Sequence, residues 1–400
     1  MKNRSAPRVR VGIEAANIRA GGGVTHLVEI LQNLDPGACG IAEVLVWCSR
    51  LVAERLPSRP WLRTDTPPAL ERGIASRLFW LNRTLEDLAN RHTDVLFAPG
   101  GTFLGRSRPV VAACQNLLPF DPSERRRFGW TRDRARLHAL ALTQGTTFRR
   151  AQAVIFPSQE ALRVTERAVG SLGHRSRVVY HGAPATPEPR CAVRHGDSVF
   201  RLLAVSGIHM YKHPWRVAEA VARLRSRGVS VQLEFVGAVG NAQAYRRLTK
   251  TLRSVDPHGE FVTCRGLVNH EDLPAIYQSA DALVFPSTCE TFGIVLVEAM
   301  AQGLPLACSN RSACPEVVGD AAVYFDPESP HQMDRALMRL VRMPALRDSL
   351  AQRGYERVKR FSWATCARET FEILAEVARC ANGANPLHVG ESTASGVNRL

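Results

Sequence analysis

Two glutamates, Glu290 and Glu298, stand eight positions apart in the one stretch of this sequence whose residue types most clearly suggest chemistry. Residues 282–286 form a short apolar run typical of a buried strand, and the apolar residues 294–301 predict a tightly packed helix. The turn at 291–294 would place helix N–H groups and the positive end of the helix dipole where a phosphate can bind. Glu298 lies inside the apolar helix, so we expect it to need a dedicated hydrogen-bond donor such as a sugar hydroxyl.

This stretch resembles the Glu-x7-Glu signature of the retaining GT-B glycosyltransferases, the "glycosyl transferases group 1" family (family 4 type), without a break from Asp281 to Pro305. The resemblance implies that Glu290 orients hydroxyls of the donor sugar and that Glu298 binds the ribose hydroxyls. It further implies that the donor lies against the turn made by Thr291, Phe292, Gly293 and Ile294.

Lys212 is one of only four lysines, and it follows an apolar run, 200–206, that predicts a strand. Open α/β sheets bind ligands at the carboxyl ends of their strands, where a compact ammonium suits a diphosphate leaving group. In the resembled family a lysine at this place binds the donor phosphates. Many members also carry an arginine five positions earlier, where this chain has Gly207. Either fewer charges hold the phosphate here, or His209 or another arginine takes the place of that arginine.

Gly22 and Gly23 follow a first predicted strand at 9–13 and precede a predicted helix. A glycine loop between strand and helix lets backbone N–H groups approach a phosphate. Its spacing is not that of a dinucleotide fingerprint, which argues against a nicotinamide or flavin enzyme. The resemblance implies that these glycines lie against the donor diphosphate and the acceptor.

Gln115 and Asn116 follow the predicted strand at 110–114, where the resembled family often has His-Asp. Neither side chain titrates, so neither can act as a general base, although both can hydrogen-bond a sugar or an acceptor. The resemblance also implies that Val268, after another strand, contacts the nucleotide base. The resemblance is more specific in the second domain, over residues 200–325, than in the first domain.

Buried strand-like runs alternate with amphipathic helical stretches, including residues 70–91, 131–150 and 158–170, which predicts parallel sheets covered on both faces. The resemblance implies that this α/β fold consists of two Rossmann-like parallel-sheet domains facing across a cleft (GT-B), with the last helix crossing back onto the first domain. The predicted parts are a first domain (1–184), a proline-containing linker (185–198), a nucleotide-sugar-binding domain (199–360), a helix crossing back onto the first domain (361–380) and a disordered tail (381–400).

The net charge of +15 is concentrated in the first half of the chain. Residues 1–190 contain 28 Lys+Arg against 16 Asp+Glu, a net of +12, which leaves 24 against 21, or +3, for residues 191–400. This excess indicates an anionic partner, namely a lipid-linked phosphate acceptor or an anionic membrane surface. Nucleic acid is disfavoured because no recognised motif accompanies the charge.

The ten cysteines contain no Cys-x2-Cys pair and mostly lie in apolar runs, which is typical of buried thiols in a reducing compartment. No Asp-x-Asp motif occurs, so we expect no metal and no cofactor other than the nucleotide-sugar donor. No apolar run is long enough to span a bilayer, and a cytoplasmic protein, peripheral at the inner membrane face, is expected.

The resemblance implies transfer of a sugar from a nucleotide-sugar to a glycan or lipid-linked acceptor, with retention at the anomeric carbon, and the residues fit a reaction that needs no metal. Two alternatives remain at the level of sequence. A nucleotide-sugar epimerase of the same fold would change the sugar without an acceptor, but Gln115 and Asn116 disfavour its proton transfers. A non-catalytic binding module would hold the nucleotide without releasing it from a nucleotide-sugar.

Overall fold

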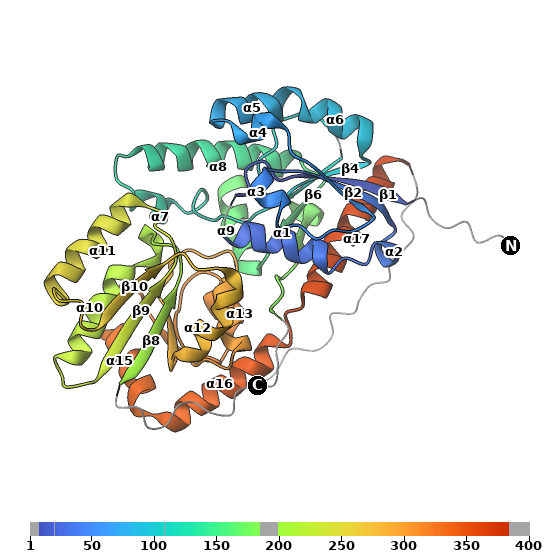
Figure 1. The fold of residues 1–400 in the computed structure, drawn as a ribbon. Coiled ribbons are helices and arrows are strands. Elements are labelled where there is room, and N and C mark those ends of the chain that lie inside the picture. Colours follow the sequence, from blue (N-terminus) through green and yellow to red (C-terminus); the bar gives the residue numbers. More distant parts are fainter. Residues whose placement is uncertain (1–7, 20, 108, 185–198, 384–400) are drawn as a thin grey trace.

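Two parallel α/β domains make up the chain, shown one above the other in Figure 1. The structure is a computed structural model that describes residues 8–19, 21–107, 109–184 and 199–383. The predicted linker, 185–198, and nearly all of the predicted disordered tail lie outside the described residues.

The first domain is built on a seven-stranded parallel sheet with the order β3-β2-β1-β4-β5-β6-β7. The strands are β1 (Val9–Glu14), β2 (Ile41–Trp47), β3 (Leu62–Asp65), β4 (Val95–Ala98), β5 (Val110–Ala113), β6 (Ala153–Phe156) and β7 (Ser176–Val178). The helices are α1 (Gly22–Gln32), α2 (Pro36–Cys39), α3 (Arg50–Ala53), α4 (Pro68–Glu71), α5 (Ile74–Arg83), α6 (Leu85–His92), α7 (Pro122–Arg126), α8 (Arg132–Arg150), α9 (Gln159–Val169) and the short η1 (Gly173–Arg175).

The second domain has a six-stranded parallel sheet with the order β10-β9-β8-β11-β12-β13. Its strands are β8 (Phe200–Val205), β9 (Val231–Val236), β10 (Val262–Gly266), β11 (Ala282–Phe285), β12 (Leu306–Ser309) and β13 (Ala322–Phe325). The helices that follow β8 are η2 (Met210–Lys212), α10 (Pro214–Arg225), α11 (Ala242–Val255), η3 (His270–Asp272), α12 (Leu273–Ser279), α13 (Ile294–Ala301), α14 (Cys314–Val318), α15 (Pro330–Arg342), α16 (Pro344–Val358) and α17 (Trp363–Ala381).

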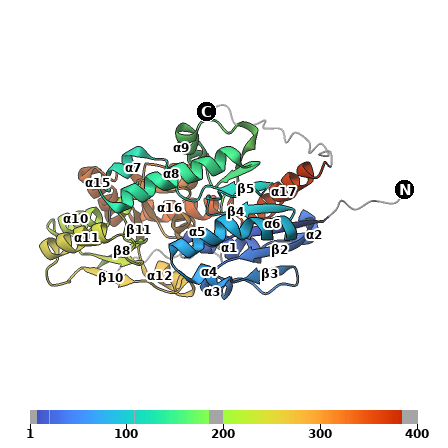
Figure 2. The same ribbon diagram turned by 90° about the horizontal axis from the view of Figure 1, so that it is seen from above.

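The last helix, α17, returns to the first domain, as predicted. Its buried face, which includes Phe371 and Leu374, belongs to the same apolar core as Ile13 of β1 and Ile30 of α1. Figures 1 and 2 show this helix, in red, among the first-domain elements rather than with α15 and α16 of the second domain. Burial of its apolar face makes α17 an integral part of the first domain.

Three expectations about elements require correction. The stretch predicted as one helical region at 70–91 is three helices, α4, α5 and α6, separated at Arg72–Gly73 and at Thr84. The edge strand β3 was not predicted, because its residues are largely exposed and show no buried apolar pattern. Residues 260–264 are a strand-like run, but β10 begins only at Val262, because the Asp256 carboxylate accepts hydrogen bonds from the backbone N–H groups of residues 260–262.

Each sheet reverses its strand order once, between β1 and β4 in the first domain and between β8 and β11 in the second. Such switch points leave a crevice beyond the carboxyl ends of the strands, where open α/β sheets bind ligands. Gly22 and Gln115 follow β1 and β5, and Lys212 and Glu290 follow β8 and β11, so the predicted site residues lie near these two crevices. Among the described residues, no helix is both long and apolar enough to cross a bilayer.

Candidate active site

The start of α13 carries the strongest sequence motif. Gly293 precedes this helix with φ of 90°, a left-handed conformation that glycine adopts without the steric cost borne by other residues. Across the interdomain gap lies the first turn of α1, since a Cβ placed on Gly22 would be 3.5 Å from Cδ1 of Ile294. The N-terminal ends of two helices, one from each domain, therefore meet at one place, which suits an anion.

Lys212 and Glu290 form an ion pair between the Nζ atom and Oε1. Their side chains are only 12% and 13% exposed, and the ammonium also lies 4.6 Å from the centre of the Phe285 ring. The Ser312 hydroxyl fixes the backbone of Glu290, accepting a hydrogen bond from its N–H and donating one to its carbonyl oxygen. The two residues that sequence reasoning assigned to donor chemistry are thus in direct contact.

Glu298 is buried in α13, as its apolar neighbours predicted, and it has a protein partner that the sequence did not reveal. The Tyr277 hydroxyl of α12 donates a 2.8 Å hydrogen bond to Oε2 of Glu298. Burial raises the pKa of Glu298, while the Tyr277 hydrogen bond and nearby His270 oppose that shift. Within the described part of the chain no other donor to this carboxylate is found, so one of its oxygens is available to a ligand.

A cavity of about 440 Å³ lies between the two domains. It is lined by residues that include Gly23, Gln115, Asn116, His209, Tyr211 and Asn241. Four of these were predicted as donor, sugar or acceptor contacts, and the structure brings them to one space. The first-domain wall also contributes Arg19 and Arg136, to which sequence reasoning gave no role at this site.

The side chain of Gln115 is oriented by a hydrogen bond to a buried histidine. Its Nε2 lies 2.8 Å from Nδ1 of His26, which is fully buried on α1. Burial lowers the pKa of His26 to about 4, so the ring is neutral and can accept the amide hydrogen at Nδ1. The Oε1 atom of Gln115 then lies beside Gly23, at 3.2 Å from the position of a Cβ there. This orientation presents a hydrogen-bond acceptor at the cleft.

The side chains of Asn116 and His209 both make contacts with neighbouring residues of the protein. The side-chain oxygen of Asn116 accepts a hydrogen bond from the backbone N–H of Leu118, which closes a turn. The His209 ring stacks on Tyr211 and lies 3.1 Å from where a Cβ on Gly207 would stand. His209 therefore occupies the space beside Gly207, the position at which many members of the family have an arginine. Burial and the charge of Lys212 lower the pKa of His209.

The remaining candidates for donor contacts, Thr291, Phe292 and Val268, are positioned mainly by their contacts within the protein. Phe292 is 1% exposed, with its ring against His181 and Phe361, so its side chain belongs to the interior. The Thr291 carbonyl accepts a 2.6 Å hydrogen bond from the Ser158 hydroxyl of the first domain. Val268 follows β10 and packs, half-buried, on the second-domain core. Any donor contact from Phe292 would thus come chiefly from its backbone.

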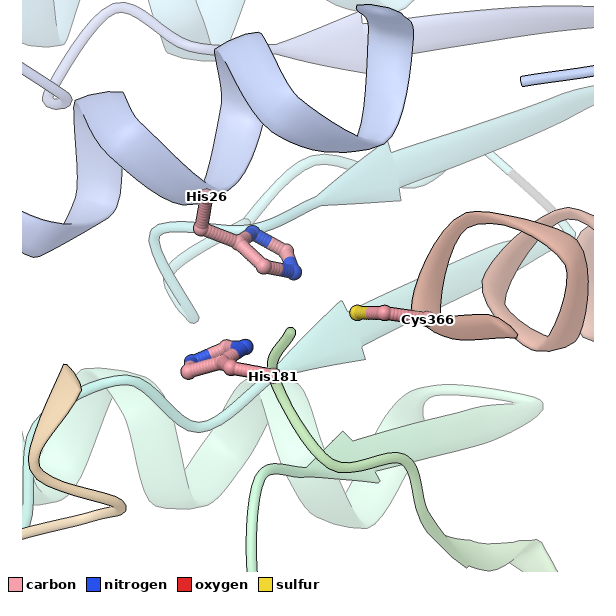
Figure 3. A group of neighbouring side chains, drawn as sticks. All are labelled: His26, His181 and Cys366. Carbon is pink, nitrogen blue, oxygen red and sulfur yellow. The ribbon is translucent and has the colours of Figure 1, made fainter. Parts of the chain in front are cut away.

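His26, His181 and Cys366 are the described side chains that could together hold a metal ion, since their ligand atoms all lie within 4.8 Å of one another. Figure 3 shows the two rings and the thiol pointing toward a common centre from α1, the loop after β7 and α17. However, a neutral His26 ring that accepts the Gln115 amide hydrogen at Nδ1 carries its own proton on Nε2, and burial raises the pKa of the Cys366 thiol to about 12. Because zinc is bound by thiolate, this burial opposes metal binding.

The fold places the chain in a known structural class. It matches the sucrose-phosphate synthase of Thermosynechococcus elongatus with a TM-score of 0.74 at 19% identity, covering 94% of this chain and 100% of that one. It matches Anabaena HepE, solved with UDP and glucose, with a TM-score of 0.68 at 18% identity, covering 92% and 100%. These similarities show the GT-B fold, the two-domain architecture of many glycosyltransferases.

The second domain has a sequence match of its own. Residues 193–357 match the sequence model of the family described as glycosyl transferases group 1. Among curated proteins, the O-antigen chain mannosyltransferase B of Escherichia coli is 38% identical over 105 residues, which is 26% of this chain and 28% of that protein. The matches span less than half the length of the first curated relatives.

Proposed function

We propose that this protein transfers a sugar from a nucleotide-sugar to a glycan or lipid-linked acceptor, with retention of the anomeric configuration and without a metal ion. The observation that carries the proposal is the meeting of the α1 and α13 N-termini close to the Lys212–Glu290 pair, at the switch points of both sheets. The match of residues 193–357 to the group 1 family and the similarity to a mannosyltransferase support it.

The residues fit the charges of the reaction. Breaking the bond between the anomeric carbon and the phosphate oxygen places negative charge on the leaving diphosphate and positive charge on the sugar ring. Lys212 and the N–H groups at Gly22, Gly23 and Gly293–Ile294 would stabilise the diphosphate. Glu290 would hold the sugar hydroxyls near the cationic ring, and Glu298 would bind the ribose hydroxyls with the oxygen that Tyr277 leaves available.

In this proposal the acceptor enters from the first-domain side of the cavity, next to Gln115. The acceptor hydroxyl attacks on the same face of the sugar that the phosphate leaves, and the departing phosphate oxygen takes its proton. Gln115 accepts a hydrogen bond from a sugar or acceptor hydroxyl, in the orientation that His26 imposes. We also propose a cytoplasmic location at a membrane face, which fits the nine described cysteines, all of them free thiols.

Ligand-induced thermal stabilisation tests the donor site. UDP, GDP, ADP and their sugars are screened against the purified protein and the Glu298→Gln variant, with the exposed Glu356→Gln as the matched control. One nucleotide at saturation should stabilise the native protein by roughly 2–4 kcal/mol, and Glu298→Gln should lose most of that shift. No shift with any nucleotide, or equal shifts in both variants, would exclude this donor site.

Product analysis tests the reaction itself. With the donor identified, NMR of the product reports the anomeric configuration, and a chelator reports the need for a metal. Release of the nucleoside diphosphate that depends on acceptor supports transfer. Interconversion of the sugar without acceptor would instead identify an epimerase, and binding without any release a non-catalytic module.

A further inference from the structure

Three arginines of the first domain, two of which line the cleft, have no acidic partner among the described residues. Arg19 lies in the loop between β1 and α1, Arg77 on α5 and Arg136 on α8. Arg19 and Arg136 line the interdomain cavity together with Gln115 and His209. Arg77 is close enough to both for their charges, together with burial, to lower its pKa. The three guanidinium groups therefore form one positive cluster, drawn from separate elements.

No ion pair joins any of the three arginines to an acidic side chain in the portions of the chain that the structure describes. The Arg19 guanidinium donates a hydrogen bond only to the backbone carbonyl of Leu70, and this bond fixes the direction of the Arg19 side chain. The Nε atom of Arg77 is buried and has no hydrogen-bond partner. Asp133, the carboxylate that lines the same cavity, instead accepts a hydrogen bond from Asn241 of the other domain.

Arg19 and Arg136 are exposed at the cavity, and the half-buried Arg77 has an Nε atom without an acceptor, so a bound anion would supply partners that these guanidinium groups lack. The planar fork of arginine matches two oxygens of one phosphate, so several arginines around one cavity are typical of phosphate recognition. We propose that Arg19, Arg77 and Arg136 form a site for a phosphate group carried by the acceptor. This proposal rests on the proposed function, because it identifies the chemical class of the acceptor for that same cleft.

The surface beside the cluster indicates where such a phosphate could come from. Ile74, Leu78 and Phe79, on the same helix as Arg77, are 64%, 48% and 68% exposed. An amphipathic helix with arginines and exposed apolar residues can lie at a lipid surface, with the phosphate headgroups near its basic side chains. The phosphate belongs either to a lipid headgroup or to a water-soluble sugar phosphate, and both would place it at the same arginines.

Calorimetric titration of inorganic phosphate and glycerol 3-phosphate into the protein tests the site. The nucleoside diphosphate found in the thermal screen is kept at saturation, so that the donor site is already filled. Arg77→Gln and the more exposed Arg136→Gln should each weaken phosphate binding roughly tenfold. Arg83→Gln, which removes an exposed arginine from the same helix, should bind phosphate like the wild type.

Absence of phosphate binding, unchanged affinity in both cluster variants, or an equal loss in Arg83→Gln would overturn the proposal. Thermal unfolding of each variant shows that it remains folded. Sedimentation with phosphatidylglycerol vesicles, compared with phosphatidylcholine vesicles, separates the two sources: vesicle binding that Arg77→Gln and Arg136→Gln weaken identifies a lipid headgroup. Phosphate binding without vesicle binding identifies a soluble phosphate.

Failure of this proposal differs from failure of the proposed function. If the arginine site is wrong but the donor site is right, the nucleoside diphosphate still binds and Glu298→Gln still abolishes its thermal shift. If the donor site is wrong, no nucleotide shift is seen, and the titration without nucleotide still shows whether phosphate binding depends on Arg77 and Arg136.

Discussion

At the scale of single residues, the Lys212–Glu290 pair determines how the free protein responds to a donor. Both side chains are nearly buried and in direct contact, so each neutralises the charge of the other. A diphosphate that binds Lys212 competes with Glu290 for the ammonium. The two residues are therefore expected to differ in their effects on binding and on turnover.

We predict that Glu290→Gln binds the nucleoside diphosphate at least as tightly as the wild type but loses turnover by about 100-fold or more. Lys212→Met should weaken nucleotide binding, and each single change should destabilise the fold by about 3–5 kcal/mol because it leaves a buried charge without its partner. Calorimetry, initial rates and urea unfolding measure these effects.

The double variant Lys212→Met/Glu290→Gln supplies the internal check. It should recover much of the lost stability, since neither charge then remains unpaired, with a coupling of up to about 3 kcal/mol. Lys250→Met, which changes a lysine on the outer surface of α11, serves as the matched control. Strictly additive single and double changes would show that the pair is not coupled.

Glu14, at the end of β1, links stability to pH. It is 1% exposed and accepts a hydrogen bond from the backbone N–H of Ala16, and burial raises its pKa to about 7. From about pH 4.5 upward the unfolded chain releases this proton while the native state retains it. The native state therefore loses stability as the pH rises toward 7, and the full penalty applies above that value.

We predict that Glu14→Gln is more stable than the wild type at pH 8, by up to roughly 3 kcal/mol, and about equally stable at pH 4.5. The amide preserves the acceptor for Ala16 but carries no charge. Urea unfolding at several pH values measures the difference. Because the buried histidines contribute equally to both proteins, a difference that stays constant with pH would contradict the assignment to Glu14.

At the scale of elements, α17 is the piece of the first domain that is contributed from the far end of the chain. Phe371 is fully buried in the first-domain core. Phe371→Ala should cost about 3–5 kcal/mol, because it removes buried surface and leaves a cavity. Glu372→Ala, next to it but on the exposed face, should change the unfolding free energy by less than about 0.5 kcal/mol. Similar unfolding midpoints for both variants would mean that the helix is not docked as described.

The elements also show which features the sequence could predict. β11 and α13 were predicted with their bounds because a buried strand and a buried helix leave continuous apolar runs broken by Gly293. Their neighbour Tyr277 was missed as the partner of Glu298, since α12 gives no sign of what its tyrosine faces in space. The Arg19, Arg77 and Arg136 cluster was missed for the same reason, because three elements far apart in sequence bring it together.

At the scale of the whole molecule, contacts across the gap hold the two domains together on either side of the cleft. On one side, both oxygens of Glu316 accept hydrogen bonds from the N-terminus of α9, at Gln159 and Glu160, with distances of 2.8 and 2.9 Å. On the other side, Arg127 donates to Glu328 and Asn241 to Asp133, each at 2.8 Å. Together with the Ser158–Thr291 hydrogen bond, these contacts help to keep the residues that line the cavity together.

We predict that Glu316→Ala shifts the molecule toward an open arrangement. The change removes a carboxylate from a helix N-terminus, which is worth about 1–2 kcal/mol and corresponds to about 5–30-fold in the ratio of closed to open forms. Small-angle scattering should show a larger radius of gyration for the variant, and the donor should restore the compact value because it binds both domains. The control is Glu356→Ala, because this exposed glutamate pairs with Lys359 at the end of its own helix, α16, and not with the other domain. An unchanged radius of gyration together with an unchanged KM for the donor would show that closure does not depend on Glu316, and the contacts on the Arg127 side would then have to maintain it.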